Sequence, residues 1–96
     1  MGMPVSTISA NTTLTVDDVL AGTLSLNITA AVDIDLPAPV EDIEPVYIFN
    51  VGTNTGTFKR SGATVRSLPN GQFFTLLTYM DSSGVVQWAA TSAAAY

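Results

Sequence analysis

The sequence predicts an all-β domain, either a small antiparallel β-sandwich or a jelly-roll-like barrel. Three observations indicate this class: threonine and valine are abundant, strand-type patterns recur at short spacing, and turn signals rich in Gly, Asn and Ser separate them. At 96 residues the chain has the length of one domain. About seven or eight short strands at this spacing favour two packed sheets or a barrel.

The first predicted strands alternate between apolar and polar residues. Residues 12–16 (TTLTV) begin the series, and in residues 23–29 (TLSLNIT) and 32–36 (VDIDL) every second residue is Leu, Ile or Val. In the last of these, Asp33 and Asp35 point to the opposite face. Such alternation is typical of strands that are half-buried and antiparallel.

Two segments between and after these strands lack strand patterning. Residues 16–22 (VDDVLAG) predict a single helical turn, with Asp17 or Asp18 as its cap. Residues 37–45 (PAPVEDIEP) contain three prolines and an acidic cluster, so they predict a loop.

The second half of the chain carries two segments that are apolar on both faces. These are residues 46–51 (VYIFNV) and 73–80 (FFTLLTYM), and we expect them to be central strands covered on both sides. The shorter predicted strands and the turn signals around them are GTNTG (52–56, a hairpin turn), TFKRS (57–61), SG (61–62), ATVRSL (63–68), PNG (69–71), MDSSG (80–84) and VVQWAAT (85–91).

The two ends of the chain have small residues and weak core patterning. We therefore expect residues 1–11 to be an N-terminal arm and residues 92–96 a C-terminal tail, around a domain of residues 12–91. No repeat with a period of about 20 to 50 residues is visible in the sequence.

Composition narrows the classes of function. The chain is 47% hydrophobic and only 11% charged, which predicts that part of its apolar surface faces other subunits. A net charge of −5 with three Lys and Arg residues argues against binding nucleic acid. The chain has no cysteine, no apolar run long enough to span a membrane and no leader-like N-terminus, so we expect a soluble, unexported protein without disulfides.

Residues suited to catalysis or cofactor binding are sparse. Histidine and cysteine are absent, which removes the usual general base, thiol nucleophile and metal ligands. Asp33 and Asp35 form a carboxylate pair about 7 Å apart by strand rise, but a solubilising role on an exposed strand face accounts for them better than glycoside hydrolysis. We predict no enzyme activity, no cofactor and no catalytic or metal site.

Several other groups have both a structural and a functional interpretation. The carboxylates of Asp17 and Asp18, and of the acidic loop 41–44, suit Ca²⁺ chemically, but neither group has the spacing of a known calcium loop. Adjacent Lys59 and Arg60 fit a solvated edge strand or a contact with an acidic partner surface.

The remaining aromatic residues are predicted to pack. Trp88 and Tyr79 fit core or interface packing better than stacking on a sugar, because no polar cluster neighbours them in the sequence.

The order of elements resembles small β-rich structural proteins of tailed bacteriophages. The elements run TLTVDDVLAGTL, VDIDLPAP, VYIFNVGTNTGTF, SGATV, LPNGQFFTLL and SGVVQWAAT, over about residues 12–90. In that pattern a TLT strand leads to V-x-LP, F-x-V-x-N-x-G, GAT, L-x-x-G and G-x-x-W elements. This chain departs from the pattern where Asn50 precedes Val51 and Gly52.

The resemblance implies one of two virion roles. The first is a head decoration (cement) protein, a homotrimer on the outer surface of the capsid that bridges major capsid subunits and is made in the host bacterial cytoplasm. The alternative is a tail-fibre or spike module that binds host-surface glycans through Trp88 or Tyr79. Room for one module between Met1 and Tyr96 favours decoration. The predicted partners are other copies of the chain and the major capsid protein, with no nucleic acid and no membrane.

The interface residues expected from this role lie in the two arms, in the basic pair and at the tryptophan. They are Met3, Pro4, Val5, Ile8, Lys59, Arg60, Trp88 and Tyr96. If the N-terminal arm becomes ordered on the capsid, deleting residues 1–10 is expected to leave the fold intact and to weaken attachment.

Overall fold

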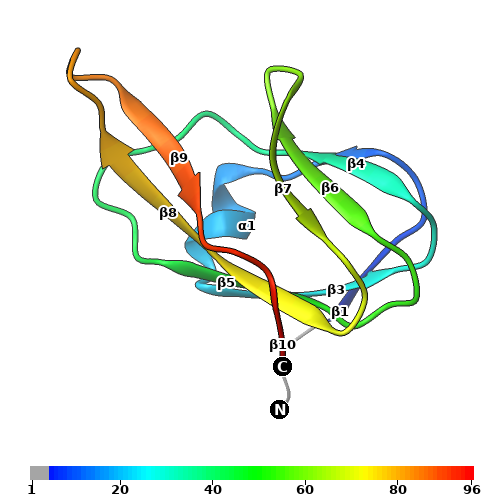
Figure 1. Ribbon diagram of the computed structural model, residues 1–96. Helices are drawn as coiled ribbons and strands as arrows, with labels where there is room; N and C mark the ends of the chain where they lie inside the picture. The colour runs from blue at the N-terminus through cyan, green and yellow to red at the C-terminus, as the bar shows by residue number, and fades with distance from the viewer. Residues whose placement is uncertain (1–4) are drawn as a thin grey trace.

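The computed structural model describes residues 5–96 and shows two β-sheets with one short helix (Figure 1). The large sheet contains β1 (Val5–Ile8), β3 (Thr23–Ile28), β5 (Val46–Asn50), β8 (Gln72–Met80), β9 (Val86–Ala90) and β10 (Ala94–Ala95). The small sheet contains β2 (Thr12–Thr13), β4 (Val32–Asp35), β6 (Gly56–Arg60) and β7 (Ala63–Leu68). The prediction of an all-β protein is confirmed.

The strand pairing is mixed, so the prediction of an antiparallel sheet is wrong for the first half of the chain. β1, β3 and β5 pair in parallel in the large sheet, and β2, β4 and β6 do so in the small sheet. Only the pairs formed by β7, β8, β9 and β10 are antiparallel. The described strands form two separate sheets rather than a closed barrel.

The parallel pairs arise because the chain alternates between the two sheets from β1 to β6. It passes from the large sheet to the small sheet between β1 and β2, β3 and β4, and β5 and β6, and it returns to the large sheet between β2 and β3 and between β4 and β5. Each pass then lies beside the previous one in both sheets (Figure 1). The segment 52–56 is therefore a crossing between sheets, and the prediction of a hairpin turn there is wrong.

One hydrophobic core fills the space between the two sheets. Phe58 of β6 and Phe74 of β8 are fully buried and meet edge to face with ring centroids 5.1 Å apart. The predicted alternation is confirmed in β3 and β4, where Leu26, Ile28 and Ile34 point inward and are at most 2% exposed. This packing holds the second half of the chain against the parallel strands.

The helical turn forms as predicted, but with a different cap. Helix α1 (Val16–Leu20) begins after Thr15, whose hydroxyl accepts from the backbone N–H of Asp18 at 3.2 Å. The Asp18 carboxylate accepts in return from the backbone N–H of Thr15 at 2.8 Å. Thr15 is thus the N-cap of a capping box, and Asp18 closes the box instead of capping the helix itself.

The central strands β5 and β8 are covered on one face only, which corrects the expectation of burial on both. Their inner residues are buried, but on the outer face Tyr47 is 45% exposed. Phe49 stacks on Phe73 at 5.2 Å and meets the Tyr96 ring at 5.6 Å. Aromatic contacts on the solvent side therefore explain why these segments carry apolar residues on both faces of the strand.

The two ends of the chain take part in the large sheet, so the predicted arm and tail are wrong over the described residues. β1 pairs with β3 through four residues, and β10 pairs with β8. The hydroxyl of Tyr96 donates to the carbonyl oxygen of Asn50 at 2.9 Å. Deleting residues 1–10 would remove an edge strand, so we no longer expect that deletion to leave the fold intact. Met3 and Pro4 lie outside the described residues.

Candidate interaction surface

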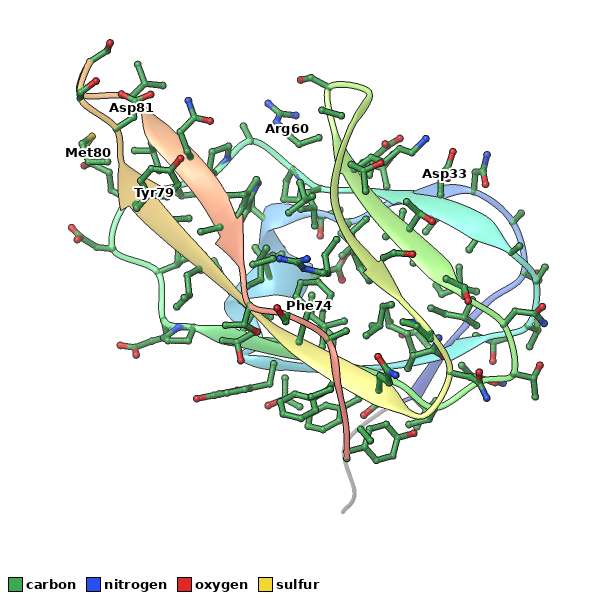
Figure 2. The ribbon with its side chains drawn as sticks, in the orientation of Figure 1. Asp33, Arg60, Phe74, Tyr79, Met80 and Asp81 are labelled. Carbon is green, nitrogen blue, oxygen red and sulfur yellow. The ribbon has the colours of Figure 1, made fainter. Side chains whose placement is uncertain are left out.

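A groove lies between two hairpins, β6–β7 and β8–β9. Its volume is about 600 Å³, and one of its walls carries Arg60 while the other carries Trp88. In Figure 2 Arg60 lies in the space between β7 and β9. The remaining lining residues are Pro39, Ser61, Ala63, Val65, Val85, Val86 and Gln87.

The groove arises because the two sheets end at the same side of the molecule. β7 is the last strand of the small sheet, and β9 pairs only with β8 in the large sheet. At one end the two strands are linked by Arg66, whose Nη2 donates to the carbonyl oxygen of Ala90 at 2.9 Å. Away from this link the two hairpins diverge, as Figure 1 shows, and the groove opens between them.

Local contacts hold the groove residues in place. Trp88 packs against the core, and its indole N–H donates to the carbonyl oxygen of Pro37 at 2.8 Å. Val65 is the additional residue where the register between β6 and β7 shifts, and it packs against the core. The guanidinium of Arg60 approaches the carbonyl oxygen of Leu36 at 3.5 Å. The floor is thus apolar, and the charge stands at the rim.

The β8–β9 hairpin beside the groove exposes apolar side chains. Tyr79 and Met80 are 52% and 50% exposed, and Val85 is 52% exposed. Figure 2 shows Tyr79 and Met80 on this hairpin, which extends beyond the end of β5. Exposed apolar side chains at the end of a projecting hairpin are available for contact with a partner.

The turn of this hairpin is organised by Asp81. Its carboxylate accepts from the backbone N–H groups of Ser83 and Val85 at 2.9 and 3.0 Å and from the side-chain amide of Gln87 at 3.1 Å. The hydrogen bond from Val85 is the main cause that lowers the pKa of Asp81, helped by those from Gln87 and Ser83.

This arrangement predicts a pH dependence of the hairpin turn. Because the folded pKa of Asp81 lies below its usual value of 3.8, its contribution to stability is present above that value and is lost as the pH falls through the lowered pKa. In an NMR titration, the Ser83 and Val85 amide signals should move only at pH values below the usual pKa of an aspartate side chain. Movement of those signals at or above pH 4 would contradict the assignment.

The structure brings together two of the eight predicted interface residues, Arg60 and Trp88. Ile8 and Val5 lie on β1, at the opposite edge of the large sheet, and Val5 is 57% exposed. Tyr96 lies on the outer face of that sheet, against Phe49.

Lys59 does not mark an edge strand as predicted, because β6 lies between β4 and β7 in the small sheet. Its Nζ pairs with the Asp33 carboxylate at 3.2 Å. This partly exposed ion pair contributes little to stability.

Sequence reasoning missed the apolar lining of the groove. Pro39, Val65 and Val86 come from three separate segments, so only the meeting of the two sheet ends brings them together. The available signal was the apolar pair Val85–Val86 directly after the predicted turn at residues 80–84.

Over residues 5–96 no three Asp, Glu, His or Cys side chains lie close enough together to share a metal ion. Within the same residues no helix has the length and hydropathy needed to cross a membrane. Comparison with protein-family models, with curated proteins and with solved structures finds no match to this chain.

Proposed function

We propose that this protein is a structural virion component, a decoration protein that forms a homotrimer on a bacteriophage head and binds the major capsid protein. The observation that carries the proposal is the apolar surface made by the β8–β9 hairpin and the adjoining groove. Buried aromatic and aliphatic anchors beside an arginine are the usual centre of a protein–protein interface. The resemblance to phage structural proteins supports the placement of this interface on a bacteriophage head.

The proposed role needs two kinds of contact, one with other copies and one with the shell. The projecting end of the hairpin, with Tyr79, Met80 and Val85, suits the contact with capsid subunits because it extends beyond the end of β5. The protein is then made in the bacterial cytoplasm and acts on the outer surface of the capsid. Neither nucleic acid nor membrane takes part in this proposal.

The proposal predicts the number of copies in virus particles. Quantitative mass spectrometry of purified virions should give a ratio near one copy per major capsid subunit, because a cement protein repeats over the whole shell. A handful of copies per particle would indicate a tail or fibre position instead. Absence from virions would contradict both roles.

A second candidate function is favoured by the surroundings of Tyr79. Its exposed ring borders a shallow hollow of about 280 Å³ that also contains Glu41 and Asp42. Aromatic rings stack on sugars, and carboxylates accept hydrogen bonds from sugar hydroxyls. A fibre module would use this hollow for host glycans.

A glycan array with the wild-type chain and Tyr79→Ala tests the second candidate. Signals that disappear in Tyr79→Ala would support glycan binding at this hollow. A wild-type array without signal, or signals unchanged by the substitution, would count against it.

A further inference from the structure

The large sheet has one unpaired edge at β1 and another at β9, on opposite sides of the molecule. Over residues 5–96, β1 pairs only with β3, and β9 pairs only with β8. An unpaired strand edge presents backbone N–H and C=O groups to any strand that approaches it. The direction of these groups can be derived residue by residue from the observed hydrogen bonds.

On β9 the outward-facing groups belong to Val86 and Trp88. The bonds from the Asp81 N–H to the Val85 oxygen and from the Thr91 N–H to the Thr75 oxygen show which residues face β8. In an antiparallel pair these positions alternate, so residues 86, 88 and 90 face away from β8. The Ala90 oxygen accepts from Arg66, which leaves Val86 and Trp88 without backbone partners over the described chain.

On β1 the outward-facing groups belong to Val5 and Thr7. The N–H of Thr29 donates to the Ile8 oxygen at 3.0 Å, so the backbone groups of Ile8, and by alternation those of Ser6, face β3. Those of Val5 and Thr7 therefore point away from the sheet. Each edge thus offers two residues, spaced by one, that can join a further strand.

We propose that β1 of one copy pairs in parallel with β9 of a second copy and so continues the large sheet between subunits. In a parallel pair a residue bonds to the two neighbours of its partner, and partners share a face. Pairing Val86 with Ser6 and Trp88 with Ile8 therefore uses the outward groups of both strands and keeps inner faces together. An antiparallel pairing of the same groups would place inner residues opposite outer ones.

This register also places Ile8 of the second copy at the groove. Ile8 is on the inner face beside Ile28, and Trp88 and Val86 are on the inner face of β9. The incoming strand would lay Ile8 against Trp88 and Val65, the apolar floor of the groove. The groove and the unpaired edge are then parts of the same interface.

Charge complementarity favours a second copy of this chain as the partner that fills the groove. Arg60 lines the groove beside Val86, and the groove lining contains no carboxylate. On the other edge, Ser6 shares a surface hollow with Asp17 and Asp18 at the start of α1. Pairing Val86 with Ser6 therefore brings the acidic start of α1 toward Arg60.

The strand directions determine how successive copies are arranged. β9 is antiparallel to β8, which is antiparallel to β5, so β9 runs in the same direction as β1 within one chain. Parallel pairing between copies therefore keeps the strand direction and is head-to-tail, which closes into a ring or continues as a filament. A three-membered ring fits the trimer proposed above; the inference deepens that self-association and rests on it, but it does not depend on the capsid.

The oligomeric mass of the full chain by sedimentation equilibrium tests the inference, with Thr7→Pro as the disrupting variant. Proline removes an N–H that points away from β3, so the backbone bonds between β1 and β3 remain while one bond to Val86 is lost. We expect at least about a tenfold weaker association. Thr7→Ala is the matched control, because it also removes the hydroxyl that accepts from Asn27 but keeps the N–H.

A charge exchange tests the register. Arg60→Glu and Asp17→Lys should each weaken association, and the double variant should restore it. High salt should reduce these differences, because the two groups are exposed. In the wild-type oligomer the amides of Thr7, Val86 and Trp88 should exchange more slowly with solvent than in the dissociated chain.

Two results would overturn the inference in different ways. A wild-type chain that stays monomeric at all concentrations would remove both the edge pairing and the trimer. An oligomer that persists unchanged in Thr7→Pro, with circular dichroism showing a folded chain, would leave the proposed self-association standing and assign it to another surface. Capsid attachment is measured separately by the copy number in virions.

Discussion

Replacing Asn50 by leucine is expected to unfold the protein at moderate temperature, although the two side chains are similar in size. Asn50 is fully buried, and its amide nitrogen donates to the carbonyl oxygens of Asn54 and Leu68 at 2.7 and 3.0 Å. Its side-chain oxygen accepts from the N–H of Gly52 at 2.9 Å. One side chain therefore joins the crossing after β5 to the end of β7.

The expected loss follows from the groups that leucine leaves without partners. Two carbonyl oxygens and one N–H, all buried or partly buried, would lose their hydrogen bonds, at up to about 1–3 kcal/mol each. The total approaches the full stability of a small domain, about 5–15 kcal/mol. Urea unfolding followed by tryptophan fluorescence at Trp88 measures the change in the free energy of unfolding.

A neighbouring asparagine supplies the control for this prediction. Asn54 donates from its amide to the carbonyl oxygen of Thr29 at 2.8 Å, in an exposed position. Asn54→Ala should therefore lower the free energy of unfolding by no more than about 1.5 kcal/mol. Equal effects of Asn50→Leu and Asn54→Ala would show that burial of the Asn50 network does not determine its contribution.

The parts of the fold that the sequence predicted well are those encoded within a single strand. Alternation assigned Leu26, Ile28 and Ile34 to the inner face because a strand side chain points to alternate faces whatever strand lies beside it. The loop at residues 37–45 was equally local, since proline cannot donate to a ladder. In both cases the prediction from the sequence agrees with the structure because residues close together in the sequence determine the local conformation.

Strand partners are not encoded locally, and this is why the parallel pairing was missed. The turn signals at residues 52–56 fit a hairpin and a crossing between sheets equally well. Asn50 distinguishes the two, since it ties this segment to Leu68 rather than to a returning strand. The three segments that pass from the large to the small sheet also differ in sequence, so no repeat marks them.

The candidate surface was predictable in its residue types but not in its assembly. Arg60 and Trp88 stood out from the sequence as a cation and an aromatic residue with a role in packing, and the structure places both at the groove. Tyr96 is predicted to lie at an interface; in the structure its ring meets Phe49 and is 59% exposed, so the interface role stays a prediction. The contact with Phe49 depends on the position of β10, which no local pattern in the sequence encodes.

Replacing Gly52 by alanine is expected to be the most damaging glycine-to-alanine change within residues 5–96. A β-carbon there would lie 2.7 Å from the carbonyl carbon of Ile28 and closer still to its backbone nitrogen and oxygen. Backbone atoms cannot rotate away as a side chain can. The Ile28 oxygen also accepts from the N–H groups of Thr53 and Asn54, both at 3.0 Å, so separating the segments breaks these bonds.

Gly56 provides the matched comparison, because an added β-carbon there also meets Ile28, but at the end of its side chain. That contact, 2.6 Å from Ile28 Cδ1, can be relieved by a change of rotamer. We therefore expect Gly52→Ala to lower the free energy of unfolding by about 3 kcal/mol or more and Gly56→Ala by about 1–2 kcal/mol. Thermal unfolding of both variants should preserve this order. The reverse order would mean that the backbone of the crossing after β5 can move apart from β3 at a lower cost than the core side chains can repack. The Asn50 hydrogen bonds, rather than the close backbone contact, would then hold the crossing against β3.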